Sequence, residues 1–169
     1  MPIQRRTLLL AGTSAALLAA CGGGDDDHPT LNIVATAQAT PSLSIPVEAV
    51  VAAGLVDALS APGPLTVFAP TNDAFVALLG ELGVTKAALL ADKSLLTTVL
   101  TYHVVSGRFL KADVPLNTPI RSLQGATFTV GADLRITDGR GRSAGIVSTD
   151  IRCTNGVVHV IDRVILPPA

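Results

Sequence analysis

One stretch of this 169-residue chain has the spacing of a hydrolase nucleophile. Residues 141–145 read GRSAG, which matches the pattern Gly-x-Ser-x-Gly with Ser143 at its centre. In enzymes that use this pattern, the serine lies on a sharp turn between a strand and a helix. Here a turn-forming Asp138-Gly139 pair precedes the motif and β-branched residues 146–149 follow it, so a hairpin is expected instead. We therefore predict no catalytic residue, and a hydrolase that uses Ser143 is the enzymatic alternative.

The histidines and acidic residues do not have the spacing of a known metal site. His103 ends an apolar helical pattern, and His159 lies in a strand pattern with apolar residues on both faces, so both should be buried and hydrogen bonded. Neither belongs to an HExxH or CxxC arrangement. Residues 25–28 read DDDH but follow three glycines, and such a chain cannot hold metal ligands in place. We expect no metal and no cofactor.

The first twenty residues predict export. Arginines at residues 5–6 precede an uncharged apolar run, residues 8–20, which is too short to span a bilayer. The run ends in Leu-Ala-Ala-Cys, which resembles the bacterial lipobox; this implies lipid attachment at Cys21 and cleavage just before it. The paired arginines allow twin-arginine export as well as Sec export. Gly22 follows the cysteine in place of aspartate, which resembles outer-membrane sorting in a cell that has an outer membrane.

Composition divides the chain into three parts: a signal peptide at residues 1–20, a lipid-anchored tether at 21–29 and one domain at 30–169. The tether is rich in glycine and aspartate, so it should be flexible and solvated. The chain has 12 basic and 13 acidic residues, and ten of each remain without the two signal arginines and the three tether aspartates. A neutral domain in a chain with 3% aromatic residues does not suit nucleic-acid binding.

Cys153 is the second of two cysteines. If Cys21 carries the lipid, Cys153 has no partner within the chain, so a structural disulfide is not expected. Two alternatives stay open for Cys153: it is free and buried as a small apolar residue, or it pairs between molecules.

Hydrophobic patterning predicts helices in the first half of the domain and strands in the second. Apolar residues at helical spacing occur within residues 45–53, 75–82 and 95–103. Helix caps are predicted at Thr71, Thr85 and Asp92. Strands are predicted at residues 65–69, 120–123, 126–130, 134–137, 146–151 and 157–166. The pattern is that of an α+β fold.

Three stretches of the domain, in order and spacing, resemble the fasciclin-like domain family. They read TVFAPTNDAF at residues 66–75, YHVVSGRF at 102–109 and NGVVHVIDRVILPP at 155–168. The resemblance covers essentially residues 30–169. It implies a fasciclin-like α+β fold, in which two packed β-sheets form a wedge surrounded by several α-helices. It also implies an extracellular or surface-attached adhesion and interaction module that is not an enzyme.

Most residues of these motifs are expected to be structural. Asn155 and Gly156 predict a tight turn in which the asparagine bonds its own backbone and the glycine takes a positive φ. The same structural role is expected for the other prominent motif residues, which are Thr71, Asn72, Tyr102, His103 and His159.

Asp150 and Ile151 are the candidate interaction residues. An Asp-Ile pair just before a Thr-Asn-Gly turn is implicated in integrin-dependent adhesion in a vertebrate matrix protein of this family, and residues 150–156 resemble that segment. Ser148 and Thr149 stand where that protein has Glu and Pro, and Arg152 replaces Met, and a bacterium has no integrin of its own. The structural alternative is that Ile151 packs in the core and Asp150 caps a turn.

These observations predict a monomeric, non-catalytic adhesion module that is held at a bacterial membrane or cell surface through Cys21. Its partner is expected to be an extracellular protein or polysaccharide. The alternative is a carrier of a small apolar ligand in the extracytoplasmic space, using a cleft between helices and sheets. Arginines at residues 135, 140 and 142 surround the hairpin and are expected to be solvated, with anionic polysaccharide or lipid headgroups as the alternative contacts.

Overall fold

The computed structural model describes residues 29–169 and confirms the α+β class. Its helices are α1 (Ile33–Gln38), the 3-10 helix η1 (Pro41–Leu43), α2 (Ser44–Ala53), α3 (Val56–Ser60), α4 (Asn72–Leu82), α5 (Lys86–Ala91) and α6 (Lys93–Tyr102). Its strands are β1 (Leu65–Pro70), β2 (Val104–Ser106), β3 (Pro119–Arg121), β4 (Thr127–Val130), β5 (Arg135–Thr137), β6 (Ser143–Cys153) and β7 (Gly156–Ile161). The predicted strand at residues 157–166 ends at Ile161, and β2 was not predicted.

The helix boundaries follow from local capping. The side chains of Thr71, Thr85 and Asp92 each accept a hydrogen bond from the backbone N–H three residues later, as predicted. Gly54 and Gly83 end α2 and α4 in the left-handed conformation, with φ of 71° and 64°. These caps satisfy backbone groups that helix ends otherwise leave without partners.

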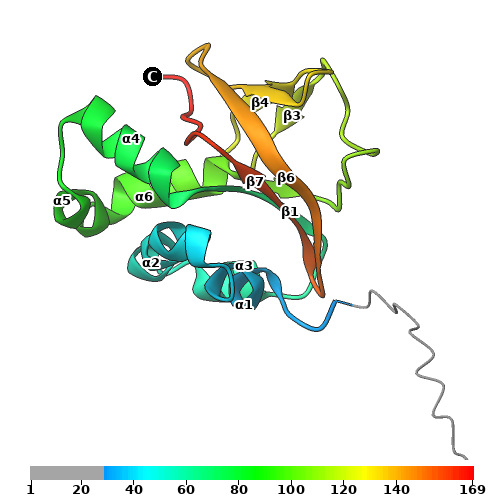
Figure 1. The fold of residues 1–169 in the computed structure, drawn as a ribbon, viewed down its shortest axis with the longest axis horizontal. Coiled ribbons are helices and arrows are strands. Elements are labelled where there is room, and N and C mark those ends of the chain that lie inside the picture. Colours follow the sequence, from blue (N-terminus) through cyan, green and yellow to red (C-terminus); the bar gives the residue numbers. More distant parts are fainter. Residues whose placement is uncertain (1–28) are drawn as a thin grey trace, which may run out of the picture.

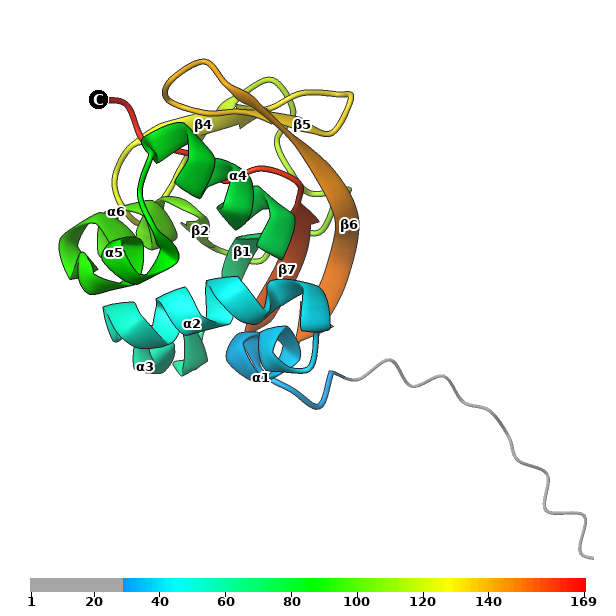
Figure 2. The same cartoon turned by 60° about the vertical axis from the view of Figure 1, so that its left-hand side comes forward.

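All strands follow one order, β2-β1-β7-β6-β5-β4-β3. β1 and β7 pair in parallel, and the other neighbouring strands are antiparallel. The first three residues of β6 pair with β5 and its later residues pair with β7, so the two sheets of the wedge are two halves joined through β6. The helices form two groups, α1–α3 and α4–α6, beside β1 and β7, and the C-terminal end of α6 reaches β4 (Figures 1 and 2).

Apolar side chains fill the spaces between these layers. One cluster joins α2, α4, α5 and α6 to Val164 and Leu166, and another packs α1 against β1 and β7. The main cluster lies between the two halves of the sheet and consists of Phe68, Tyr102, Val105, Val114, Ile120, Phe128, Val130, Ile136, Ala144, Ile161 and Ile165. Within residues 29–169, no helix is both long enough and apolar enough to cross a membrane.

The turn between β6 and β7 packs directly against the start of β1. A Cβ atom on Gly156 would lie 1.9 Å from the carbonyl oxygen of Leu65, which is closer than any side chain can approach. Buried Asn155 accepts the N–H of Ile33 at 3.0 Å and donates to two carbonyls at the end of α3, the shorter contact being 2.7 Å. The predicted details of this turn are therefore wrong. Asn155 bonds two helices instead of its own backbone, and Gly156 is required for close approach, not for a positive φ.

Buried Asp138, in the loop between β5 and β6, holds the C-terminal segment that follows β7. Its carboxylate accepts the N–H of Leu166 at 3.0 Å and both the N–H and the Nε–H of Arg142, at 2.8 and 3.1 Å. Burial by itself would raise the pKa of Asp138. The hydrogen bonds from Leu166 and Arg142 outweigh that effect, and the pKa lies below its usual value.

The arginines beside Asp138 also contact this segment. Arg142 donates to the carbonyl of Val164 at 2.8 Å and pairs with Glu81 on α4, while Arg140 donates from Nε to the carbonyl of Pro167 at 3.1 Å. The expectation that this arginine cluster is solvated is wrong for Arg142, whose side chain is only 20% exposed.

His103 fixes the same segment from the other side. Its Nδ1 donates to the carbonyl of Val99 at 2.7 Å, and its Nε2 accepts the N–H of Ile165 at 3.1 Å, so the ring is neutral. Burial lowers the pKa of His103 to about 4, because the charged ring would lose its hydration.

Replacement of Gly156 by alanine should destabilise the domain more than an ordinary surface substitution does. The added methyl group would overlap the Leu65 carbonyl, so β1 and β7 would have to separate locally. We expect a loss of about 3 kcal/mol or more in the free energy of unfolding, measured by urea denaturation. Gly80→Ala on α4, where no atom lies within 4 Å of the new Cβ, is the matched control and should not destabilise. Equal stability of the two variants would contradict the close approach.

The stability of the domain should fall as the pH drops from 6.5 towards 4. The folded state holds His103 with a pKa of about 4 and the unfolded chain holds it near 6.5, so the unfolded state takes up protons first. Between pH 7 and pH 5 the loss should be about 2 kcal/mol, and His103→Gln should flatten this dependence. An NMR titration of the His103 ring with a midpoint above pH 6 would show the burial argument to be wrong.

Candidate functional site

The predicted interaction pair lies on β6, the strand that joins the two halves of the sheet. The pairing of β6 with β7 has two irregularities, between Ile146 and Ser148 and between Ser148 and Ile151. Asp150 lies inside the second irregularity and has a φ of 60°, which places it in the left-handed region. Aspartate tolerates this conformation better than most residues do. The chain thereby leaves the regular strand ladder, and Asp150 lies exposed on the surface.

Two hydrogen bonds fix Asp150 in this conformation. Its N–H donates to Nδ1 of His159 at 3.3 Å, and its Oδ1 accepts the N–H of Lys111 at 2.6 Å. His159 is itself held, because its Nε2–H donates to the carbonyl of Phe109 at 2.8 Å and its ring stacks on Phe68 with centroids 5.4 Å apart. The prediction that His159 is buried and hydrogen bonded is confirmed. Asp150 is thus held from β7 and from the loop after β2.

The structure separates the two members of the predicted pair. Ile151 is half-buried and packs with the apolar cluster beneath α1, which includes Cys153 and Val158. Asp150 instead presents a carboxylate with one oxygen engaged by Lys111, and exposed Arg152 lies two residues further along the strand. A fixed, exposed carboxylate can accept charge-assisted hydrogen bonds from a basic side chain or from sugar hydroxyls.

The sequence did not reveal the loop residues Phe109 and Lys111 as supports of this site. Their backbone groups make the contacts, so their side-chain types carried no signal. The only pointer was that the family-like stretch at residues 102–109 ends at Phe109.

The other motif residues have structural partners. Thr71 caps α4 as predicted. Asn72 accepts the N–H of Ile45 at 2.9 Å and so connects the start of α4 to α2. The hydroxyl of buried Tyr102 donates to the carbonyl of Thr127 at 2.8 Å and accepts the N–H of Gly139 at 2.9 Å. These residues position the helices and the β5–β6 loop around the sheet.

The two candidate chemistries of catalysis and metal binding do not assemble in the described chain. Ser143 is the exposed first residue of β6 and is followed by strand, which is not the geometry of a nucleophile elbow. Both ring nitrogens of His103 and of His159 are occupied by backbone groups. Residues 29–169 contain no group of three potential metal ligands, and residues 25–28 lie outside the described range.

Cys153 is buried and forms no disulfide within residues 29–169, and this burial favours the first of the two alternatives for it. Its Sγ donates to Oγ1 of Thr36 at 3.3 Å, and burial raises the pKa of the thiol. Such a thiol is unreactive. Cys21, the predicted lipidation site, lies outside the described residues.

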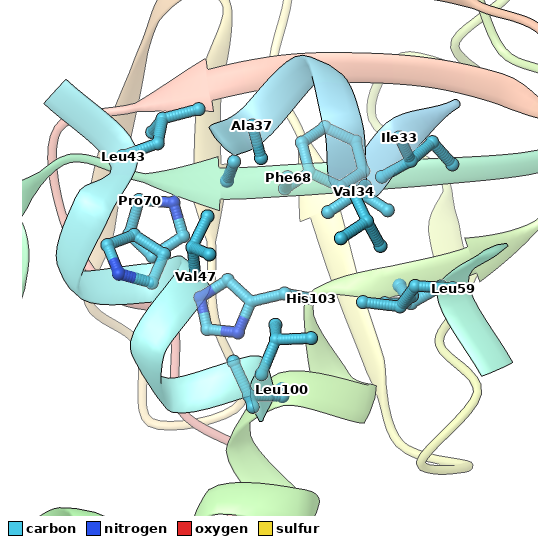
Figure 3. Close-up of a pocket in the computed structure, with 15 residues that line it drawn as sticks. Ile33, Val34, Ala37, Leu43, Val47, Leu59, Phe68, Pro70, Leu100 and His103 are labelled. Carbon is cyan, nitrogen blue, oxygen red and sulfur yellow. The ribbon is translucent and has the colours of Figure 1, made fainter. Parts of the chain in front are cut away.

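A narrow apolar slot lies between the helices and β1, in the region where the carrier alternative places its apolar ligand. It is enclosed by α1, α2 and β1, with Val34, Val47 and Phe68 on its walls and His103 as its only polar side chain (Figure 3). Its volume is about 50 Å³, against about 150 Å³ for a cavity that holds benzene and about 300–1,000 Å³ for ordinary ligand pockets. The slot is too small to support the carrier alternative.

Comparison with known proteins identifies the fold and its relatives. The family model described as the fasciclin domain matches residues 41–167. Protein sll1483 of Synechocystis is 45% identical over 141 residues, which cover 82% of this chain and 74% of that protein. The cell surface glycolipoprotein MPB83 of Mycobacterium bovis is 40% identical over 118 residues, which cover 68% of this chain and 49% of that protein.

A solved structure shows the same fold. It is the FAS1 domain pair from the insect cell adhesion molecule Fasciclin I, which aligns with a TM-score of 0.67 and 16% identity over 82% of this chain and 51% of that chain. Relatives with this domain are associated with cell surfaces and adhesion, and the family is generally non-enzymatic. The fold expected from the three motifs is thereby confirmed, and the chain belongs to the fasciclin domain family.

Proposed function

We propose that this protein is a lipid-anchored cell-surface module that binds an extracellular protein or polysaccharide without catalysis. The relatives support the setting, since one is named as a cell surface glycolipoprotein and another as a cell adhesion molecule. The domain is neutral, which favours recognition by short-range contacts over long-range electrostatic attraction.

The observation that carries the proposal is the conformation of Asp150. A non-glycine residue in the left-handed region stores strain, and such residues concentrate at binding sites when the surroundings hold them in place. His159 and Lys111 hold Asp150 through its N–H and one carboxylate oxygen, and the side chain remains exposed. A partner then meets a preorganised carboxylate and loses less conformational entropy on binding.

Anchoring would turn a weak contact into a stable one. The predicted lipid at Cys21 and the predicted tether at residues 21–29 would hold the domain within about 26 Å of the membrane. The described chain joins the domain near the β6–β7 turn, where the carbonyl of Leu31 accepts the N–H of Thr154 at 2.9 Å (Figure 1). Many anchored copies would bind a repetitive partner with higher avidity than one domain alone.

Asp150→Asn should weaken adhesion without altering the fold. Asparagine keeps an oxygen for the Lys111 N–H and tolerates the left-handed region, so only the charge is lost. We expect about tenfold weaker binding of purified protein to intact cells or to isolated surface polysaccharide. Asp133→Asn is the matched control, because Asp133 is exposed and also accepts a nearby backbone N–H.

The interpretation requires that both asparagine variants keep the melting temperature of the original protein. If both variants adhere as strongly as the protein without substitutions, Asp150 is not the contact residue. Loss of adhesion in both would point to net charge instead of to this site.

Cys21→Ser should abolish acylation of the protein, because no diacylglyceryl group can be attached without the thiol. Mass spectrometry of the protein that keeps Cys21 should show that this N-terminal cysteine is acylated. A mature N-terminus beyond Cys21 would mean a secreted protein without a lipid anchor.

A further inference from the structure

A larger groove than the slot of Figure 3 lies between α4, α5 and α6 and the C-terminal segment. Its volume is about 190 Å³. The buried side chains of Phe75, Leu96 and Leu166 form its floor. Leu82 and Leu95 on its rim are 39% and 38% exposed, although both are large apolar residues. The groove therefore offers apolar surface that the fold itself does not cover.

One charged residue, Arg140, lines this groove. Its backbone N–H donates to Oδ1 of Asp138 at 2.9 Å. Its side-chain Nε donates to the carbonyl of Pro167 at 3.1 Å, and this contact holds the guanidinium in position. Within residues 29–169, the Arg140 guanidinium has no carboxylate within ion-pair distance, in contrast to those of Arg142 and Arg163. The neighbouring Pro167 and Pro168 have no N–H to offer. Arg140 is thus a fixed cation at the edge of an apolar groove.

We propose that the groove binds a small amphipathic carboxylate, with its aliphatic or aryl body on the apolar floor and its carboxylate on Arg140. The volume slightly exceeds the roughly 150 Å³ that holds benzene, so a body of about six carbons fits. A guanidinium recognises a carboxylate through paired N–H donors, and it repels a cationic group. This site is separate from Asp150 on β6 and does not depend on the adhesion proposal.

Matched ligands test the chemistry. Sodium hexanoate, hexan-1-ol and hexylamine share the same six-carbon chain and differ in the head group. Isothermal titration calorimetry of the purified full-length protein should give a Kd for hexanoate of about 1 mM or below. Hexan-1-ol should bind about tenfold more weakly, and hexylamine more weakly still. Equal binding of hexanoate and hexan-1-ol, or no binding of hexanoate at this concentration, would overturn the proposal.

Matched variants test the location. Arg140→Gln should reduce hexanoate binding to the level of hexan-1-ol, while Arg121→Gln, at an exposed arginine on β3, should leave it unchanged. Thr98→Phe places a ring in the groove from a half-buried helix position and should abolish binding of both ligands, with Arg140 intact. Unchanged hexanoate binding in Thr98→Phe would exclude this groove. If Arg140→Gln destabilises the loop, the comparison of ligands and the Thr98→Phe variant still decide.

Discussion

The fold depends on the close packing of the β6–β7 turn against β1, which Gly156 permits and Asn155 secures. The Asn155 amide bonds partners 122 and 96 residues away in the chain, one at the start of α1 and one in α3. A buried amide without partners would destabilise the folded state by about 1–3 kcal/mol, and this turn cannot move without leaving the amide unpaired. A shift of one residue would also exchange the two faces of β7. The turn therefore sets the register of β7 against both β1 and β6.

This register determines what the surface can present. His159 on β7 must lie opposite Asp150 on β6 for its Nδ1 to accept the Asp150 N–H, and the Phe109 carbonyl must meet its other nitrogen. A buried side chain thus holds an exposed carboxylate in an uncommon backbone conformation. The same principle applies to the C-terminal segment, which Asp138 and His103 hold in place beside the helices. In both places buried polar groups fix the geometry of the surface residues, which is how a scaffold preorganises a binding surface.

Local features of this fold could be predicted from the sequence, and long-range polar contacts could not. The helix caps at Thr71, Thr85 and Asp92 were predictable because a cap and its partner lie three residues apart. Asp138 looked like an ordinary turn residue, because its partner Leu166 lies 28 residues further along the chain. The sequence pointed to Asp150, but no pattern indicated the left-handed φ in the middle of a strand or the loop that supports it. Charge in a glycine-rich loop suggested solvent exposure for Arg142, whereas Glu81, its partner on α4, is 61 residues away.

The anchored protein is proposed to bind its partner through the surface around Asp150 on β6. Photocrosslinking on intact cells tests this proposal most directly. A photoreactive side chain placed at position 152, exposed on β6 beside Asp150, should capture a surface partner, and the same group at position 121 on β3 should not. The yield of the product at position 152 should also fall about tenfold when Asp150 is replaced by asparagine. The same product from both positions, or an undiminished yield at position 152 without the Asp150 charge, would contradict recognition through this surface.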